Sequence, residues 1–199
     1  MKQILLFGGT FDPPHLGHLM MAELALEQIG VDEVWFLPAP LPPHKLTQAH
    51  RPYAQRVRMT EALIAGYRNM SVSTIEASLA VPSFTVDTVE ACQRQYPEFD
   101  FRFLIGSDSL GDLPMWHRAH QLVGNVRFVV AVRSSHGIQE TLANSLRALP
   151  KLQVQVIEMP LLDISSTWLR NRLHAGQSVC GLVPDRVLEL WQATGGGEP

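Results

Sequence analysis

Short apolar runs alternate with longer amphipathic stretches along most of the chain. The short runs are rich in β-branched and aromatic residues, which is typical of strands buried in a parallel sheet. They lie at 3–7, 33–37, 70–75, 101–105, 126–132 and 153–157. Strands that alternate with helical stretches indicate βαβ units. The pattern therefore predicts a Rossmann-like α/β fold, with an open, mostly parallel sheet and helices on both faces.

The stretches between these runs repeat their apolar residues with the period of a helix. In 16–29, for example, Leu19, Ala22 and Leu26 fall on one face. Comparable stretches lie at 53–65, 85–95, 139–148, 165–175 and 184–192. No internal repeat or low-complexity tract divides the chain. We therefore expect one domain over 1–194, followed by a loose C-terminal tail at 195–199.

Composition narrows the class of protein further. The chain has 199 residues, of which 46% are hydrophobic, and its 16 Lys and Arg nearly balance 19 Asp and Glu. A net charge of -3 lacks the basic excess of a nucleic-acid-binding protein. No signal peptide or apolar run long enough for a membrane span occurs. Cys92 and Cys180 form no Cys-x-x-Cys pattern, so we expect packing thiols in a reducing, cytoplasmic protein without nucleic-acid or membrane partners. A homo-oligomer is compatible with the sequence.

The candidate chemistry begins where the first predicted strand meets the first helix. Gly8 and Gly9 allow a ligand to approach the backbone closely, and the helix that follows offers unpaired N–H groups that favour anions. His15 and His18 are three residues apart, so their imidazoles share one helical face. The spacing fits phosphate binding by both rings. It also fits a capping or packing role, or a zinc site with Asp12 as the nearest third ligand.

A second motif opens the helix predicted at 165–175. Ser165 is a natural N-cap, Ser166 and Thr167 place hydroxyls in the first turn, and Arg170 returns one turn later on the same face. Hydroxyls, amides and a guanidinium that converge in this way can bind an anion. The alternative is an ordinary capped helix with a solvated arginine.

Three further features follow predicted strands, where ligands bind in open α/β sheets. The segment 38–52 contains five prolines and is a candidate pocket wall. Gly106 and Asp108 follow the fourth strand, where Asp108 could accept a ribose hydroxyl or cap a helix. Trp116 offers a flat face for an aromatic ligand, or packs in the core.

Together these motifs resemble a known family of enzymes. The two signatures resemble the nucleotidyltransferases of the His-x-Gly-His superfamily, and four further strings narrow the resemblance to bacterial nicotinate mononucleotide adenylyltransferases. The signatures are Gly8-Gly9-Thr10-Phe11-Asp12-Pro13 with His15-Leu16-Gly17-His18, and Ile164-Ser165-Ser166-Thr167 with Arg170. The further strings are Pro42-Pro43-His44-Lys45, Pro82-Ser83-Phe84-Thr85, Gly106-Ser107-Asp108-Ser109-Leu110 and Pro114-Met115-Trp116. The resemblance runs from Lys2 to about Trp191.

This resemblance implies transfer of AMP from ATP to nicotinate mononucleotide, which yields nicotinate adenine dinucleotide (deamido-NAD) and pyrophosphate in NAD biosynthesis. It implies that His18 donates to the α-phosphate, that His15 helps to hold the triphosphate, and that Arg170 acts with them in catalysis. Mg²⁺ would be carried by the ATP phosphates, with no metal site on the protein. The remaining ATP-binding residues implied are Gly8, Gly9, Thr10, Phe11, Gly106, Asp108, Ser165, Ser166 and Thr167.

The resemblance also implies a site for the mononucleotide. Backbone amides near Thr85 and His117 would hold the nicotinate carboxylate, and Trp116 would stack on the pyridine ring. The other residues implied are His44, Lys45 and Arg133. Two positions depart from the family pattern, since His117 stands where a tyrosine is frequent and Arg133-Ser134-Ser135 where Arg-Pro-Gly is common. Two other functions stay open: an adenylyltransferase for nicotinamide mononucleotide or phosphopantetheine, and a nucleotide-binding regulatory module without turnover.

Overall fold

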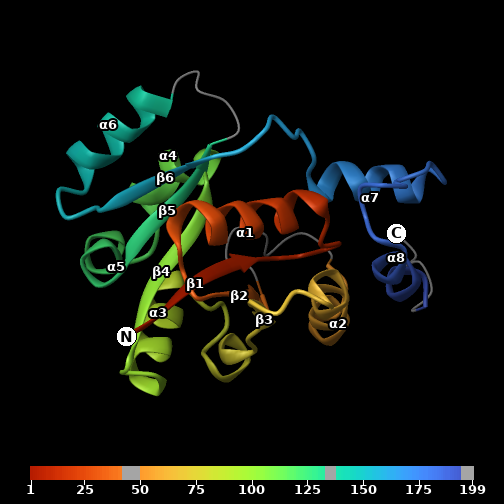
Figure 1. Cartoon of the computed structure of the whole chain (residues 1–199), viewed down its shortest axis with the longest axis horizontal. Helices are drawn as coiled ribbons and strands as arrows, with labels where there is room; N and C mark the ends of the chain where they lie inside the picture. Colours follow the sequence, from red (N-terminus) through yellow and green to blue (C-terminus); the bar gives the residue numbers. More distant parts are fainter. Residues whose placement is uncertain (42–49, 133–137, 194–199) are drawn as a thin grey trace.

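The apolar runs pair side by side into one sheet in the computed structural model, which describes residues 1–41, 50–132 and 138–193 (Figure 1). Six strands lie in the order β3-β2-β1-β4-β5-β6, and every pairing is parallel. The strands are β1 (Lys2–Gly9), β2 (Glu33–Pro38), β3 (Met70–Val72), β4 (Phe99–Gly106), β5 (Arg127–Val132) and β6 (Val154–Glu158). The predicted Rossmann-like parallel sheet is therefore confirmed.

Helices cover both faces of this sheet, because the central strands bury apolar side chains on both sides. The helices are α1 (Leu16–Ile29), α2 (Tyr53–Ile64), α3 (Thr85–Gln95), α4 (Ser107–Asp112), α5 (Ala119–Asn125), α6 (Ile138–Ala148), α7 (Ser166–His174) and α8 (Asp185–Gln192). One core cluster contains buried residues of α1, α2, α7 and α8, and the other contains residues of α3, α4 and α5. Figure 1 shows α1 crossing the sheet, with α2, α7 and α8 beyond one end of it.

The predicted elements all occur, but their ends shift and short ones were missed. The strand predicted at 70–75 ends at Val72, because the 3-10 helix η2 (Ile75–Ser78) follows it. A helix near α4 was considered only as the alternative role of Asp108, and α5 and the 3-10 helix η3 (Leu113–Met115) were not predicted, since such short helices do not display a helical period. Pro184 is the N-cap of α8 rather than its first residue.

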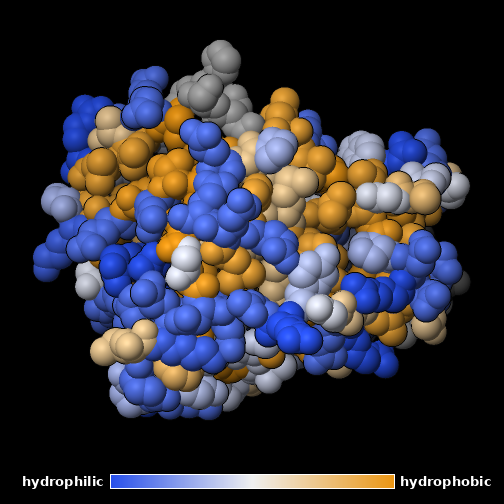
Figure 2. Space-filling view, viewed as in Figure 1, coloured by the Kyte–Doolittle hydropathy of each residue, from blue (hydrophilic) through white to orange (hydrophobic). Residues whose placement is uncertain are grey.

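The surface and the cysteines complete the outline. Cys92 lies in the core, where burial raises the pKa of its thiol to about 12, but Cys180 is exposed, so the expectation that it packs was wrong. Figure 2 shows polar and apolar side chains mixed over one face, and Val156 and Leu161 are among the exposed apolar residues. No helix in the described ranges is long and apolar enough to span a membrane.

Candidate functional site

A crevice opens where the order of the strands reverses. The chain leads outward from β1 through β2 to β3, then crosses back to β4 on the other side of β1. Pairing between β1 and β4 stops at Leu6 and Phe103, although β1 continues along β2 to Gly9 and β4 continues along β5 to Gly106. The carboxyl ends of the two central strands therefore separate, and such a switch point is where open α/β sheets bind ligands.

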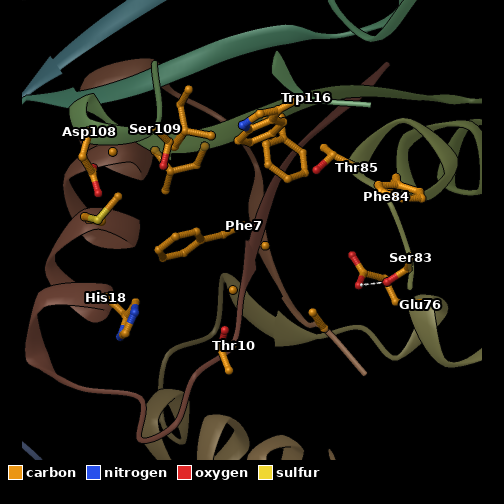
Figure 3. Close-up of a pocket in the computed structure, with 18 of the residues that line it drawn as sticks. Phe7, Thr10, His18, Glu76, Ser83, Phe84, Thr85, Asp108, Ser109 and Trp116 are labelled. Carbon is orange, nitrogen blue, oxygen red and sulfur yellow. Dashed lines mark hydrogen bonds between the residues drawn. The ribbon is translucent and has the colours of Figure 1, made fainter. Parts of the chain in front are cut away.

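The crevice leads into a pocket of about 640 Å³. The lining residues used below are Phe7, Gly8, Gly9, Thr10, His18, Glu76, Ser83, Phe84, Thr85, Gly106, Asp108, Trp116 and His117. Figure 3 shows His18 and Asp108 at one end, Phe84 and Thr85 at the other, and Phe7 and Trp116 between them. The pocket thus joins a polar, glycine-rich end to an aromatic end.

The first loop owes its shape to close packing between Gly9 and Phe11. A Cβ at Gly9 would lie 2.8 Å from Cζ of Phe11, closer than real Cβ atoms approach a neighbour. Phe11 itself has a φ of 51°, which side chains rarely adopt, and its buried ring packs on Phe7 and Phe36. The ring of Phe11 thus lies in the core, and it is the loop backbone that faces the pocket.

His15 and His18 close the start of α1 with reciprocal hydrogen bonds. Nδ1 of His15 accepts from the amide of Gly17, and Nδ1 of His18 accepts from the amide of His15, both at 3.2 Å. A ring nitrogen that accepts a hydrogen bond carries no proton, so in both rings the proton lies on Nε2. The capping alternative is therefore correct for both residues, and His18 also lines the pocket.

The two imidazoles are also held by packing. His15 is 2% exposed, and the centroids of the two rings lie 3.8 Å apart. On its other side His18 contacts Phe11, with centroids 5.0 Å apart in an edge arrangement. Contacts on both sides limit rotation of the His18 ring, so the orientation of its Nε2–H is fixed before any ligand binds.

The second predicted motif lies directly against the first. Ser165 caps α7 by accepting from the amide of Trp168 at 3.2 Å, as expected. The hydroxyl of Ser166 donates to the carbonyl of Pro13 at 2.9 Å. Arg170 donates from Nη1 to the carbonyl of Asp12 at 2.7 Å and from Nη2 to the hydroxyl of Thr167 at 3.2 Å. Residues more than 150 positions apart are therefore joined at one loop.

A buried arginine supports the same loop from below. Arg56, 1% exposed, donates to the carbonyls of Thr10 at 2.8 Å, Pro40 at 3.0 Å and Arg51 at 3.0 Å. Burial lowers the pKa of Arg56, and the nearby carboxylate of Asp12 opposes that shift. One guanidinium therefore ties the glycine loop to the chain on both sides of 42–49. The sequence offered no signal for this role, because all three acceptors are backbone carbonyls.

The aromatic end of the pocket is built around the start of α3. Phe84, which precedes that helix, stacks on His117 with ring centroids 4.2 Å apart. Trp116 is half-buried and meets Phe103 and Phe128 edge to face, with centroids 6.5 Å from each. Trp116 therefore packs against the core and also lines the pocket, so both positions considered for it from the sequence are observed.

The predicted site residues fall into three groups. Those that line the pocket are Gly8, Gly9, Thr10, His18, Gly106, Asp108, Thr85, Trp116 and His117. Those that support or adjoin it without lining it are Phe11, His15, Ser165, Ser166, Thr167 and Arg170. His44, Lys45 and Arg133 lie outside the described residues. The sequence analysis missed Phe7, Glu76 and Phe84 as lining residues.

Asp108 and Glu76 are the carboxylates in the pocket lining. Asp108 is exposed and lies in the first turn of α4, whose N-cap is Gly106, so Asp108 does not cap a helix. Glu76 is buried and accepts hydrogen bonds from two hydroxyl groups. In the described ranges, no three His, Cys, Asp or Glu side chains are grouped as metal ligands.

Comparisons with known proteins identify the family of this chain. The model of the cytidylyltransferase-like family matches residues 6–172. A protein of Exiguobacterium sibiricum named "Probable nicotinate-nucleotide adenylyltransferase" is 43% identical over 94% of this chain and 95% of its own. The "Nicotinate-nucleotide adenylyltransferase" of Bacillus subtilis is 34% identical over 98% of each chain.

Solved structures share the fold. The nicotinic acid mononucleotide adenylyltransferase of Plasmodium falciparum complexed with NaAD has a TM-score of 0.80 at 19% identity, over 98% of this chain and 96% of its own. At that identity the likeness concerns the fold alone. The family model and the two relatives show more: this chain belongs to the cytidylyltransferase-like family and, within it, to the nicotinate-nucleotide adenylyltransferases.

Proposed function

We propose that this chain transfers AMP from ATP to nicotinate mononucleotide and releases pyrophosphate. The observation that carries this proposal is one continuous pocket with two different ends. The glycine-rich end, beside Gly9 and the start of α1, suits a triphosphate, and the aromatic end, beside Trp116 and Phe84, suits a pyridine ring. Relatives named for the same reaction support it.

The reaction needs positioning more than activation. A phosphate oxygen of the mononucleotide forms a bond to the α-phosphorus of ATP. The bond between that phosphorus and the oxygen that bridges the α- and β-phosphates breaks. Pyrophosphate leaves with the electron pair, and no proton has to be removed from the attacking phosphate. Catalysis then depends on alignment and on stabilising the charge that develops on the phosphates.

His18 supplies that stabilisation in our proposal. We assign the donor role to its Nε2–H, because Nδ1 already accepts from the amide of His15 and the ring is held in place. A donor already aimed at developing charge does not have to reorganise during the reaction. His15 supports His18 through ring contact, and a direct bond from His15 to the triphosphate stays a prediction.

In our proposal the triphosphate is held jointly by the loop after β1 and the first turn of α7. We assign its binding to the backbone of Gly8 and Gly9, to Thr10, and to the first turn of α7, where Ser165, Ser166, Thr167 and Arg170 offer hydroxyl, amide and guanidinium donors. Support comes from the contacts of Ser166 and Arg170 with the first loop. Gly106 and Asp108 bind the adenosine. At the other end, Trp116 stacks on the pyridine ring, and the amides of Thr85 and His117 bind its carboxylate; His44, Lys45 and Arg133 remain predictions.

Mg²⁺ would be held by the ATP phosphates and water, and it would offset part of the negative charge on the triphosphate. We assign it no protein ligand, because the side-chain donors at the phosphate end are mainly imidazole, hydroxyl and guanidinium groups. Both substrates are small nucleotides, and a net charge of -3 gives no reason to add a nucleic-acid partner. We place the protein in the cytoplasm, where ATP is abundant and Cys92 and Cys180 stay reduced.

The test is pyrophosphate release from Mg-ATP, run in parallel with nicotinate mononucleotide, nicotinamide mononucleotide, phosphopantetheine and no acceptor. We expect kcat/KM to be at least about a hundredfold higher for the nicotinate compound, which equals about 2.7 kcal/mol. Release with a different acceptor would keep the mechanism and overturn the assignment of the aromatic end. Binding of ATP without release from any acceptor would favour a regulatory module.

A further inference from the structure

Glu76 is a buried carboxylate in the pocket wall for which the proposed reaction has no use. It lies in η2, is 7% exposed, and lines the pocket beside Ser83 (Figure 3). Within the described residues no Lys, Arg or His forms an ion pair with it. A buried acid without a basic partner costs stability compared with an apolar residue of similar size. Its position in the wall of the pocket therefore calls for another explanation.

The partners of Glu76 lie on both sides of the start of α3. Oε2 of Glu76 accepts from the hydroxyl of Ser83 at 2.8 Å, and Oε1 accepts from the hydroxyl of Thr88 at 3.0 Å. Ser83 precedes the helix and is 5% exposed, whereas Thr88 lies in its first turn and is fully buried. One carboxylate thus fastens the incoming loop to the first turn of the helix.

That turn presents backbone donors to the pocket. The amides of Asp87 and Thr88 both donate to the carbonyl of Phe84, so the amides of Thr85 and Val86 precede the first hydrogen bonds of the helix. Phe84 is the N-cap residue and forms no side-chain cap. Glu76 takes hydroxyl protons instead of these amide protons, so the amides stay available at the positive end of the helix.

We propose that Glu76 is a positioning residue for the mononucleotide: through Ser83 and Thr88 it holds the first turn of α3 so that the amide at Thr85 meets the pyridine carboxylate. This inference rests on the proposed function. Glu76 acts through Ser83 and Thr88, and the triphosphate end is built from other elements. Loss of Glu76 therefore weakens binding of nicotinate mononucleotide selectively and leaves ATP binding unchanged.

The experiment compares steady-state kinetics of the wild type, Glu76→Ala and Glu76→Gln. We expect Glu76→Ala to raise KM for nicotinate mononucleotide about tenfold, equivalent to about 1.4 kcal/mol, with KM for ATP and kcat changed less than about twofold. Glu76→Gln keeps one acceptor oxygen and can donate a hydrogen bond to the second hydroxyl. Its KM for nicotinate mononucleotide should therefore stay close to that of the wild type. The preference of Glu76→Ala for nicotinate over nicotinamide mononucleotide should also fall, because the displaced amide of Thr85 binds the carboxylate that only the nicotinate compound carries.

The double variant Ser83→Ala/Thr88→Val provides a second route to the same answer. It removes both donors and keeps the carboxylate, and adding Glu76→Ala to it should raise KM no further. It also replaces Glu76→Ala if that variant does not fold. Glu98→Ala is the matched control, since Glu98 is an exposed glutamate away from the pocket lining.

The outcomes separate this inference from the proposed function. A wild type that neither binds nor uses nicotinate mononucleotide overturns both. A wild type that prefers it, together with a Glu76→Ala variant whose KM for it is unchanged, overturns the inference alone. Equal rises in both KM values, or a lower kcat with both KM values unchanged, show a general structural role and also overturn the inference.

Discussion

At the scale of single residues, the site depends on two short-range constraints. The hydrogen bond from the amide of His15 fixes the proton of His18 on Nε2. At the same end of the pocket, Asp108 folds back over Gly106 so closely that a Cβ at Gly106 would overlap its carboxylate. Each constraint sets the orientation of a side chain in the pocket without changing its chemical nature. Each can be tested by substitution.

His18→Ala should lower kcat about 10² to 10³-fold, because it removes a donor aimed at the transition state, with the Kd for ATP changed less than about threefold. His18→Asn can still accept a hydrogen bond from the amide of His15, but its side chain is too short to reach the phosphate. Compared with His18→Ala, it should therefore have a higher melting temperature and an equally low kcat. His120→Ala, at an exposed histidine, is the control. Calorimetry measures the Kd for ATP. If His18→Ala loses tight ATP binding as well as turnover, the role assigned to His18 is contradicted.

Gly106→Ala should raise KM for ATP about tenfold, because the new Cβ displaces the carboxylate of Asp108. The φ of Gly106 is -77°, which alanine adopts freely, so the melting temperature should hardly change. Gly111→Ala is the matched control, since its Cβ would make ordinary contact with Thr141 at 3.6 Å. An unchanged KM for ATP in Gly106→Ala would remove Asp108 from the adenosine site.

At the scale of elements, the phosphate loop is held from two directions. The helix α7 contacts its carbonyls from one side through Ser166 and Arg170. The helix α2 contacts them from the other through Arg56. These contacts use backbone acceptors, so they fix the path of the loop without occupying the amides that face the pocket.

Arg170→Lys keeps the charge but loses the fork that joins the carbonyl of Asp12 to the hydroxyl of Thr167. We expect KM for ATP to rise about tenfold, or about 1.4 kcal/mol, with KM for the mononucleotide nearly unchanged. Arg172→Lys in the same helix is the control, because Arg172 is partly exposed and donates to the carbonyl of Ser178 instead. Kinetics of Arg170→Lys that match those of the control would show that charge alone suffices.

Arg56→Met leaves three partly buried carbonyls without their donor, so the free energy of unfolding should fall by about 3 kcal/mol. Urea titration measures the loss. Arg58→Met, two residues along the same helix at an exposed position, should change stability by less than about 0.5 kcal/mol. Equal stability of the two variants would contradict the supporting role of Arg56.

At the scale of the whole molecule, the buried carboxylate of Glu76 links stability to pH. Burial raises its pKa, although the hydrogen bonds from Ser83 and Thr88 oppose the shift. An acid whose pKa is higher in the folded state binds more protons there than in the unfolded chain. Its contribution to stability is therefore greatest below the unfolded pKa, near 4.5, and is lost as pH rises through the folded pKa.

Glu76→Gln has no such proton to lose. Its free energy of unfolding relative to the wild type should therefore increase as pH rises from the ordinary value of 4.5 through the raised pKa. Urea titrations of both proteins at each pH measure the difference. A difference that stays constant, or that falls with pH, would show that the carboxyl has no raised pKa in the folded protein.

Most of the elements and the fold class could be predicted from the sequence alone. Six apolar runs and the helical periods between them were enough for the parallel sheet, because burial on both faces leaves a pattern in any single strand. The sequence also determined the motifs at 8–18 and 165–170, since glycines, paired histidines and a serine cap have local reasons for their spacing. The short helices α4 and α5 were too brief to leave such a pattern.

Only the tertiary structure decided which residues meet. It brought the carbonyls of Asp12 and Pro13 to Arg170 and Ser166, and it placed Glu76 against the start of α3. Arg56 and Glu76 were invisible in the sequence because their partners are carbonyls and hydroxyls, which almost every segment offers. Contacts of that kind depend on the path of the backbone, and the path follows from packing of the whole sheet with its helices.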